Sequence, residues 1–191
     1  MQEVDVEVVC QTLREASYER LSTPTGDDYY GGGRVDACWI FYNNIHWKLI
    51  KHKVVDMDDL ATLGLAEFQD DSNSEFQDIF IRNNYGILAK LENRSNGKQV
   101  VISNTHLYWD PAFEFVKLCQ SHYLALNIKQ FVSDDPNVPV VFCGDLNSMP
   151  GATIHSYLTQ GKVDRDSVGV PSYELTPELQ RLSVYKWLYE G

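Results

Sequence analysis

The chain has 191 residues, 43% of them hydrophobic and 23% charged, which is the size and composition of one globular domain. Its 27 acidic and 16 basic residues give a formal net charge of −11. This charge excludes broad electrostatic attraction to nucleic-acid phosphates, but not a small site that reaches a phosphate through divalent cations. No apolar run approaches the length of a membrane span, and the N-terminus lacks the pattern of a signal peptide.

The first half of the chain predicts a helix followed by short strands. Asp5 is a suitable N-cap for a helix that places Val6, Val9 and Leu13 at helical spacing. The glycine-rich segment 26–33 is expected to be a loop. Runs typical of strands follow at residues 35–42, 47–55, 78–82, 85–92 and 99–108.

Much of the acidity belongs to residues 54–81, which contain eight acids and no Lys or Arg. Without these eight, 19 acidic and 16 basic residues remain, a net charge of −3. The stretch QDDSNSEFQD (69–78) is typical of a solvated surface loop. A segment that binds cations or a partner is the alternative interpretation.

The second half predicts a long helix over 113–132, a strand over 138–145 and a helix from Ala152 to Gly161. The strand VPVVFCGD is apolar at nearly every position, so we expect it to be covered on both faces. A final helix is expected to begin at Thr176. The pattern predicts a single α/β domain over residues 1–191, without repeats.

The four cysteines form no CxxC pair and lie among apolar neighbours. We expect reduced thiols of an intracellular protein rather than a zinc site. They are Cys10, Cys38, Cys119 and Cys143.

Candidate chemistry is concentrated at the end of the strand in VVFCGDLNSMP (140–150). Asp145 and Asn147 are two residues apart, so in an extended segment their side chains share a face. One carboxylate and one amide there could orient a water or hold a hard cation. The alternative is a turn in which both side chains only satisfy backbone donors.

Two further residues are candidates. His106 lies late in the strand of ISNTHLYWDP (102–111), where a histidine can donate a proton or stabilise a phosphoryl oxygen. Glu3 precedes the first helix, where a carboxylate suits Mg²⁺. A structural histidine and an ordinary acid favoured by the helix dipole are the respective alternatives.

Taken together, these motifs resemble the endonuclease/exonuclease/phosphatase superfamily, and specifically its Ccr4-type deadenylases. The segments NTHLYWDP (104–111), VKLCQ (116–120) and CGDLNSMP (143–150) carry the resemblance, with QEVD (2–5), VDACWIFY (35–42) and SYLTQGKV (156–163). WDP and VKL favour the Ccr4-like over the nocturnin-like branch. Phe115 departs from the family pattern, which usually has an acid before Val-Lys.

The resemblance implies a four-layered α/β sandwich and a Mg²⁺-dependent 3′→5′ exoribonuclease that acts on poly(A) and releases 5′-AMP. By matching position, Glu3 would be a metal ligand, His106 would contact the scissile phosphate and Asp145 would orient or activate the attacking water. Asn147 would support metal or phosphate, and Pro111 would lie near the adenine base. Two metals can stabilise the attacking and leaving oxygens together, which suits an acidic protein.

The resemblance also implies a deadenylase complex as partner, poly(A) RNA rather than DNA as substrate, no membrane, and a cytoplasmic location with the nucleus as a second one. The family's upstream Tyr-Asn strand and downstream Asp and His motifs have no counterpart in this sequence, so we expect a sandwich incomplete at both termini and weak or no activity. A remnant that acts by protein binding is one alternative function. Another superfamily phosphodiesterase or phosphatase is the other.

Overall fold

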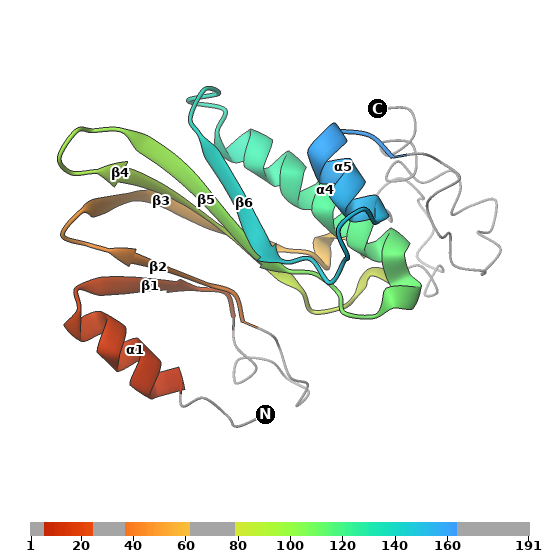
Figure 1. Cartoon of the computed structure of the whole chain (residues 1–191), viewed down its shortest axis with the longest axis horizontal. Helices are drawn as coiled ribbons and strands as arrows, with labels where there is room; N and C mark the ends of the chain where they lie inside the picture. The colour runs from red at the N-terminus through yellow and green to blue at the C-terminus, as the bar shows by residue number, and fades with distance from the viewer. Residues whose placement is uncertain (1–5, 25–36, 62–78, 164–191) are drawn as a thin grey trace.

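The computed structural model describes residues 6–24, 37–61 and 79–163, which are arranged in four layers (Figure 1). Helix α1 lies against a sheet of two strands, and a second sheet of four strands carries two helices on its other face. The elements are α1 (Val6–Glu15), β1 (Tyr18–Ser22), β2 (Trp39–Asn43), β3 (Trp47–Asp56), β4 (Tyr85–Asn93), β5 (Gln99–His106), η2 (Pro111–Phe113), α4 (Glu114–Phe131), β6 (Val140–Asp145) and α5 (Thr153–Gln160). The expected α/β sandwich is confirmed.

The order of the larger sheet is β3-β4-β5-β6. The first two pairs are antiparallel, and β5 and β6 are parallel. A parallel pair needs a crossover connection, which α4 provides between β5 and β6. Both strands therefore end at the same edge of the sheet, with His106 opposite Asp145.

Among the described residues, three apolar clusters hold the layers together. Ile40 and Tyr42 of β2 meet Ile87, Ala89 and Leu91 of β4 between the sheets. On the other face, a cluster that contains Val55, Leu88, Val101, Leu124 and Phe131 joins the sheet to α4. A third cluster joins α4 and α5 beyond the ends of the strands and contains Leu60, Phe80, Leu107, Phe115 and Ile154. This third cluster includes Leu107 and therefore anchors the segment that follows β5.

Lysines of β3 and β4 face the end of α4. A bulge between Leu49 and Lys51 shifts the alternation of β3. Lys51 Nζ donates to Phe131 O and to Asp134, each at 2.7 Å, at the helix end that favours cations. Lys90 is only 3% exposed and lies 3.5 Å from Asp134 and 3.6 Å from Asp135.

The predicted strands over 47–55, 85–92 and 99–108 and both predicted helices over 113–132 and 152–161 are confirmed with small shifts of their ends. Gly161 has φ 73°, and its N–H donates to Tyr157 O, which ends α5 as expected. Strand β1 was not predicted, because YERLS lacks apolar alternation. None of the helices described is both long and apolar enough to cross a membrane.

The prediction of a strand over 78–82 is wrong for the residues described. Residues 79–80 are helical and 81–84 are irregular. Phe80 is buried against Phe115, with ring centroids 6.2 Å apart. The N–H groups of Arg82 and Asn83 donate to the Asp58 carboxylate instead of a neighbouring strand. Side-chain bonding therefore replaces a β ladder.

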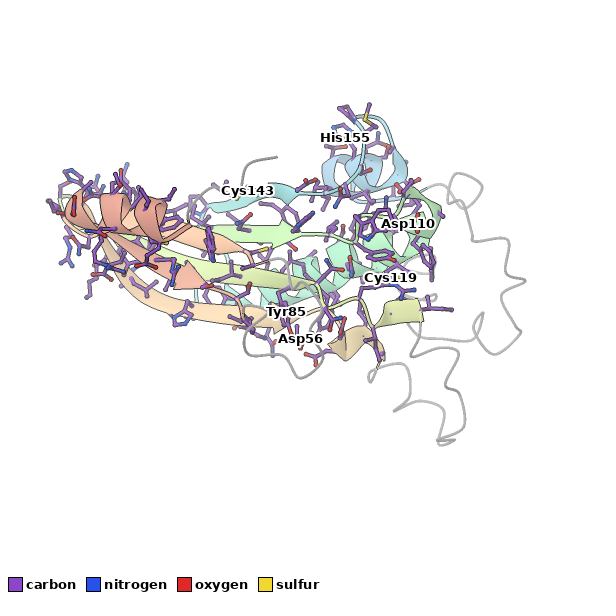
Figure 2. The ribbon with its side chains drawn as sticks, turned by 90° about the horizontal axis from the view of Figure 1, so that it is seen from below. Asp56, Tyr85, Asp110, Cys119, Cys143 and His155 are labelled. Carbon is purple, nitrogen blue, oxygen red and sulfur yellow. The ribbon has the colours of Figure 1, made fainter. Side chains whose placement is uncertain are left out.

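The expectation that 138–145 is covered on both faces is also wrong. Within the described residues β6 pairs only with β5, so it is an edge strand, and Val140 and Val141 are 41% and 47% exposed. Of the four free thiols, Cys10, Cys38 and Cys119 are buried and Cys143 is exposed on β6 (Figure 2). Figure 2 also shows Asp56 beside Tyr85, its partner across β3 and β4.

Several predicted features lie outside the described residues. They are Glu3, the Asp5 cap, the glycine-rich segment 26–33, the acidic stretch 69–78 and the helix expected from Thr176.

Candidate active site

The parallel register of β5 and β6 brings two of the predicted site residues together. Thr105 pairs with Gly144 and His106 with Asp145, and the His106 Nε2 lies 3.9 Å from the Asp145 Oδ2. The side chain of His106 is 31% exposed and that of Asp145 is 68% exposed. A carboxylate and an imidazole therefore share an open position at the sheet edge, where α/β proteins place reactive groups.

Of the two conformations that the sequence left open for the segment after Asp145, the structure has the turn and not the extended chain. Asn147 has φ 46°, a left-handed conformation that asparagine tolerates. Its N–H donates to Asp145 Oδ1 at 2.9 Å, and its Nδ2 donates to Leu107 O at 2.7 Å. The turn interpretation is therefore correct for the backbone, yet it also orients both side chains. Because Asn147 Nδ2 donates to Leu107 O, the orientation of the amide is fixed, and Oδ1 is its acceptor atom.

The segment after His106 is fixed by aromatic contacts. The ring centroids of Tyr108 and Phe113 are 5.4 Å apart, and the Arg82 Cζ lies 4.9 Å from each centroid. Trp109 is 66% exposed. Asp110 caps η2 by accepting from the Ala112 N–H at 2.9 Å.

Pro111 is the first residue of η2 and is exposed at the surface. The structure brings His106, Asp145 and Asn147 together, and it places Pro111 further along the segment that follows β5. Glu3, the predicted metal ligand, cannot be placed because it precedes the described residues.

Oxygen donors at this edge suit a hard cation. The Asp145 carboxylate and the Asn147 amide oxygen are ligand types that Mg²⁺ accepts, and Mg²⁺ is often held by one or two carboxylates plus substrate phosphates. Within residues 6–24, 37–61 and 79–163, no three His, Cys, Asp or Glu side chains gather in a way that could hold a metal ion. The donors present fit a cation site completed by a further ligand.

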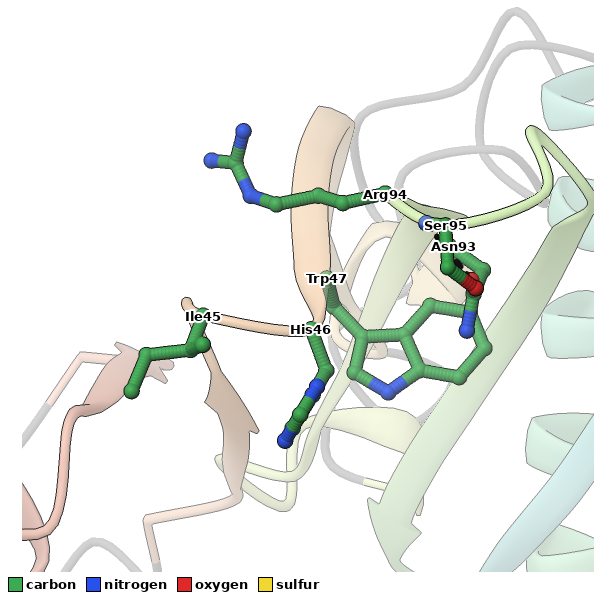
Figure 3. A pocket seen from close by; sticks show the side chains of 6 residues that line it. All are labelled: Ile45, His46, Trp47, Asn93, Arg94 and Ser95. Atoms are coloured by element: carbon green, nitrogen blue, oxygen red, sulfur yellow. Dashed lines mark hydrogen bonds between the residues drawn. The ribbon is translucent and has the colours of Figure 1, made fainter.

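A hollow at the opposite end of the sheet is separate from this site. It measures about 430 Å³ and is lined by the turns after β2 and β4: Ile45, His46, Trp47, Asn93, Arg94 and Ser95 (Figure 3). Its polar groups serve the turns themselves, since Arg94 Nε donates to Asn44 O and Asn93 accepts from Ser95. Strand β5 begins with Gln99 near the hollow and ends with His106 at the candidate site. The hollow is therefore not part of that site.

Sequence reasoning missed three buried polar residues that contact the site segments. They are Asn84, Lys117 and Gln120, which are 7%, 1% and 0% exposed. The two helical ones belong to VKLCQ, which supported the family resemblance without receiving a role. The available signal was the presence of Lys and Gln in a helix segment that is otherwise apolar.

No protein-family model matches the sequence. The Ccr4 3′-5′-exoribonuclease subunit of the CCR4-Not complex from Mycosarcoma maydis is 30% identical over 155 residues, covering 70% of this chain and 23% of that protein. Its counterpart from Yarrowia lipolytica is 32% identical over 152 residues, covering 68% and 21%. The chain thus spans less than a quarter of the length of these curated relatives.

Solved structures share the fold at lower identity. The catalytic domain of human Nocturnin has a TM-score of 0.61 and 21% identity, covering 82% of this chain and 53% of that one. ANGEL2, a 2′,3′-cyclic phosphatase, has a TM-score of 0.64 and 22% identity, covering 81% and 40%. An endonuclease/exonuclease/phosphatase family protein from Bacteroides thetaiotaomicron has a TM-score of 0.56 and 13% identity, covering 80% and 50%.

Proposed function

The chain belongs to the Ccr4-type branch of the endonuclease/exonuclease/phosphatase superfamily, and from this we propose that it is a Mg²⁺-dependent 3′→5′ exoribonuclease that shortens poly(A) and releases 5′-AMP. The observation that carries the proposal is the pairing of His106 with Asp145 at the ends of parallel strands, with their side chains 3.9 Å apart. The curated relatives are named as 3′-5′ exoribonucleases.

Each side chain has a role that its geometry allows. Asp145 is exposed and presents Oδ2 beside His106, so it can orient a water and accept its proton. His106 would donate a hydrogen bond to a phosphoryl oxygen. Asn147 is held by Leu107 O, which leaves its amide oxygen to support a cation or the phosphate.

Divalent cations would supply the charge that the chain lacks. Glu3, Asp145 and Asn147 would hold Mg²⁺, which when bound stabilises charge on the attacking and leaving oxygens of an in-line displacement. This assignment also explains how a protein of net charge −11 can work on RNA, because the phosphate is reached through cations.

Adenine preference would come from contact with the base. Single-stranded RNA is recognised by stacking on flat side chains and by contacts to base edges. The segment after His106 exposes Trp109 and, two residues later, Pro111, which gives a surface of this kind. We propose that the adenine of the scissile nucleotide lies against Pro111.

The relatives are named as subunits of the CCR4-Not complex. We propose accordingly that this chain acts in mRNA decay within a deadenylase complex, in the cytoplasm and also in the nucleus.

The test is digestion of a labelled poly(A) oligomer by the full chain with Mg²⁺ and with chelator. In keeping with the weak activity expected from the sequence, we expect slow Mg²⁺-dependent laddering, and Asp145→Ala should lower its rate by about 100- to 10,000-fold, the usual contribution of a positioned base. Asp134→Ala, which removes an exposed aspartate at the end of α4, is the matched control and keeps the activity.

The alternatives give different results in the same assay. Equal digestion of poly(U) would remove the adenine preference, and release of phosphate from phosphoinositides would indicate another superfamily phosphatase. A folded wild-type chain that degrades no substrate with Mg²⁺ would refute the enzyme and favour a binding remnant.

A further inference from the structure

The first half of α4 buries polar side chains that the fold does not require. Every residue from Phe115 to Ser121 is buried, and two of these residues are Lys117 and Gln120. Burying an ammonium group costs free energy unless it is paired and hydrogen-bonded. Their partners therefore indicate what these side chains do.

Lys117 holds the turn that follows β6. Its Nζ donates to Asn147 O at 3.0 Å and pairs with Glu114 Oε2 at 2.8 Å. The carbonyl it binds belongs to the residue with φ 46°, the least favourable backbone conformation of the turn. Lys117 thus stabilises the conformation in which the Asn147 N–H meets Asp145.

Glu114 supplies the carboxylate in this arrangement. The sequence has Phe115 where the family usually has an acid, and Phe115 packs against Phe80. Glu114 lies one residue earlier, three positions before Lys117, and is on the same helix face. The Lys117 charge is therefore paired despite the departure at Phe115.

Gln120 holds the segment that follows β5. Its Oε1 accepts from the Tyr108 N–H at 3.0 Å, and its Nε2 donates to Asn84 Oδ1 at 3.0 Å. Asn84 in turn donates through Nδ2 to His106 O at 3.0 Å. The buried amide pair thus binds the peptide groups on both sides of Leu107.

We propose that Lys117 and Gln120 are positioning residues that set the distance between His106 and Asp145. They are three residues apart, so one rigid helix face holds both site segments. The bond from Asn147 Nδ2 to Leu107 O joins the two segments directly. The catalytic consequence rests on the proposed nuclease function, whereas the positioning itself does not.

The kinetic test uses two variants of similar length that lose the hydrogen bonds, Lys117→Met and Gln120→Met. The matched controls are Lys129→Met and Gln130→Met, which alter exposed residues of the same helix. We expect kcat to fall about 100-fold in the two test variants, the cost of a shift of roughly 1 Å at a reacting group, with KM within about threefold of wild type. The controls keep both constants.

A second readout is independent of activity. In the wild type we expect Asp145→Asn to shift the NMR signals of the His106 ring, because the two side chains are 3.9 Å apart. In the Lys117→Met background the same substitution should shift them much less. A role in stability alone would not alter this response.

Folded test variants with wild-type kcat, or an undiminished His106 response, would overturn the proposal. If the wild-type chain degrades no RNA, the proposed function fails and the His106 response still decides the positioning. If Lys117→Met does not fold, Glu114→Gln, which keeps an acceptor but removes the charge, is measured instead and should weaken the response in the same direction.

Discussion

Gly144 makes the approach of β6 to β5 possible, and replacing it tests the geometry of the site. Gly144 has φ 141°, a conformation that side chains disfavour, and an added Cβ would lie 2.0 Å from Thr105 O. The obstacle is backbone of the neighbouring strand, so no side chain can rotate away to relieve it. Gly144→Ala must therefore move β6 relative to β5.

The expected cost has two parts. Placing a residue with a Cβ at positive φ costs about 1–2 kcal/mol. Overpacking against a neighbour that must shift costs about 1–3 kcal/mol more. We expect Gly144→Ala to lower the free energy of unfolding by about 2–5 kcal/mol. Asp145 is the next residue, so hydrolysis of poly(A) should fall with it.

Gly97→Ala is the matched control. Gly97 also has positive φ, 69°, but an added Cβ would meet nothing within 4 Å. It therefore carries only the backbone cost of about 1–2 kcal/mol, part of which is offset by the lower entropy of the unfolded chain. The difference between the two variants in urea unfolding measures the contact with Thr105 together with the extra backbone cost of φ 141° over φ 69°. Losses that agree within about 0.5 kcal/mol, an ordinary surface effect, would refute the close approach of the strands.

Three further predictions concern hydrogen bonds and charges elsewhere in the fold. Asp58→Ala should lower the free energy of unfolding by about 2 kcal/mol in urea, because two partly buried N–H groups lose their acceptor, and Asp58→Asn should lose less. Lys90→Met should change it by less than about 1 kcal/mol, since its partner aspartates are 58% and 42% exposed and their charges stay solvated. Burial, assisted by the hydrogen bond to Glu19, raises the pKa of Tyr42 to about 12. Its protonated phenol therefore stabilises the fold fully below pH about 10 and loses that contribution as the pH rises to about 12, which stability measurements against pH should show in the wild type and not in Tyr42→Phe.

The sequence predicted the elements whose signals are local. The alternation in 47–55 and 99–108 gave β3 and β5, and Gly161 marked the end of α5. The placement of His106 and Asp145 at strand ends followed from the same patterns.

What the sequence could not supply was which neighbours each segment has. The run 78–82 has strand composition, yet the N–H groups of Arg82 and of the following Asn83 bind Asp58, which lies more than twenty residues earlier in the chain. Strand β6 has the composition of a covered strand and is an edge strand among the described residues. Pairing partners are set by distant residues, so composition alone does not predict them.

Helix α4 shows the same limit at the site. On periodicity, a polar residue in a helix indicates a solvent-facing position, and Lys117 and Gln120 would be assigned to an exposed face. They are buried because Asn147, Asn84 and the Tyr108 N–H lie where their polar ends reach. None of these partners is a helical neighbour of the two side chains. Buried polar residues in an otherwise apolar helix segment depart from the local pattern, and natural sequences make such departures mainly at functional sites. The VKLCQ segment of α4 therefore matters to the proposed reaction through the two segments that it holds, although neither side chain is required to touch the substrate.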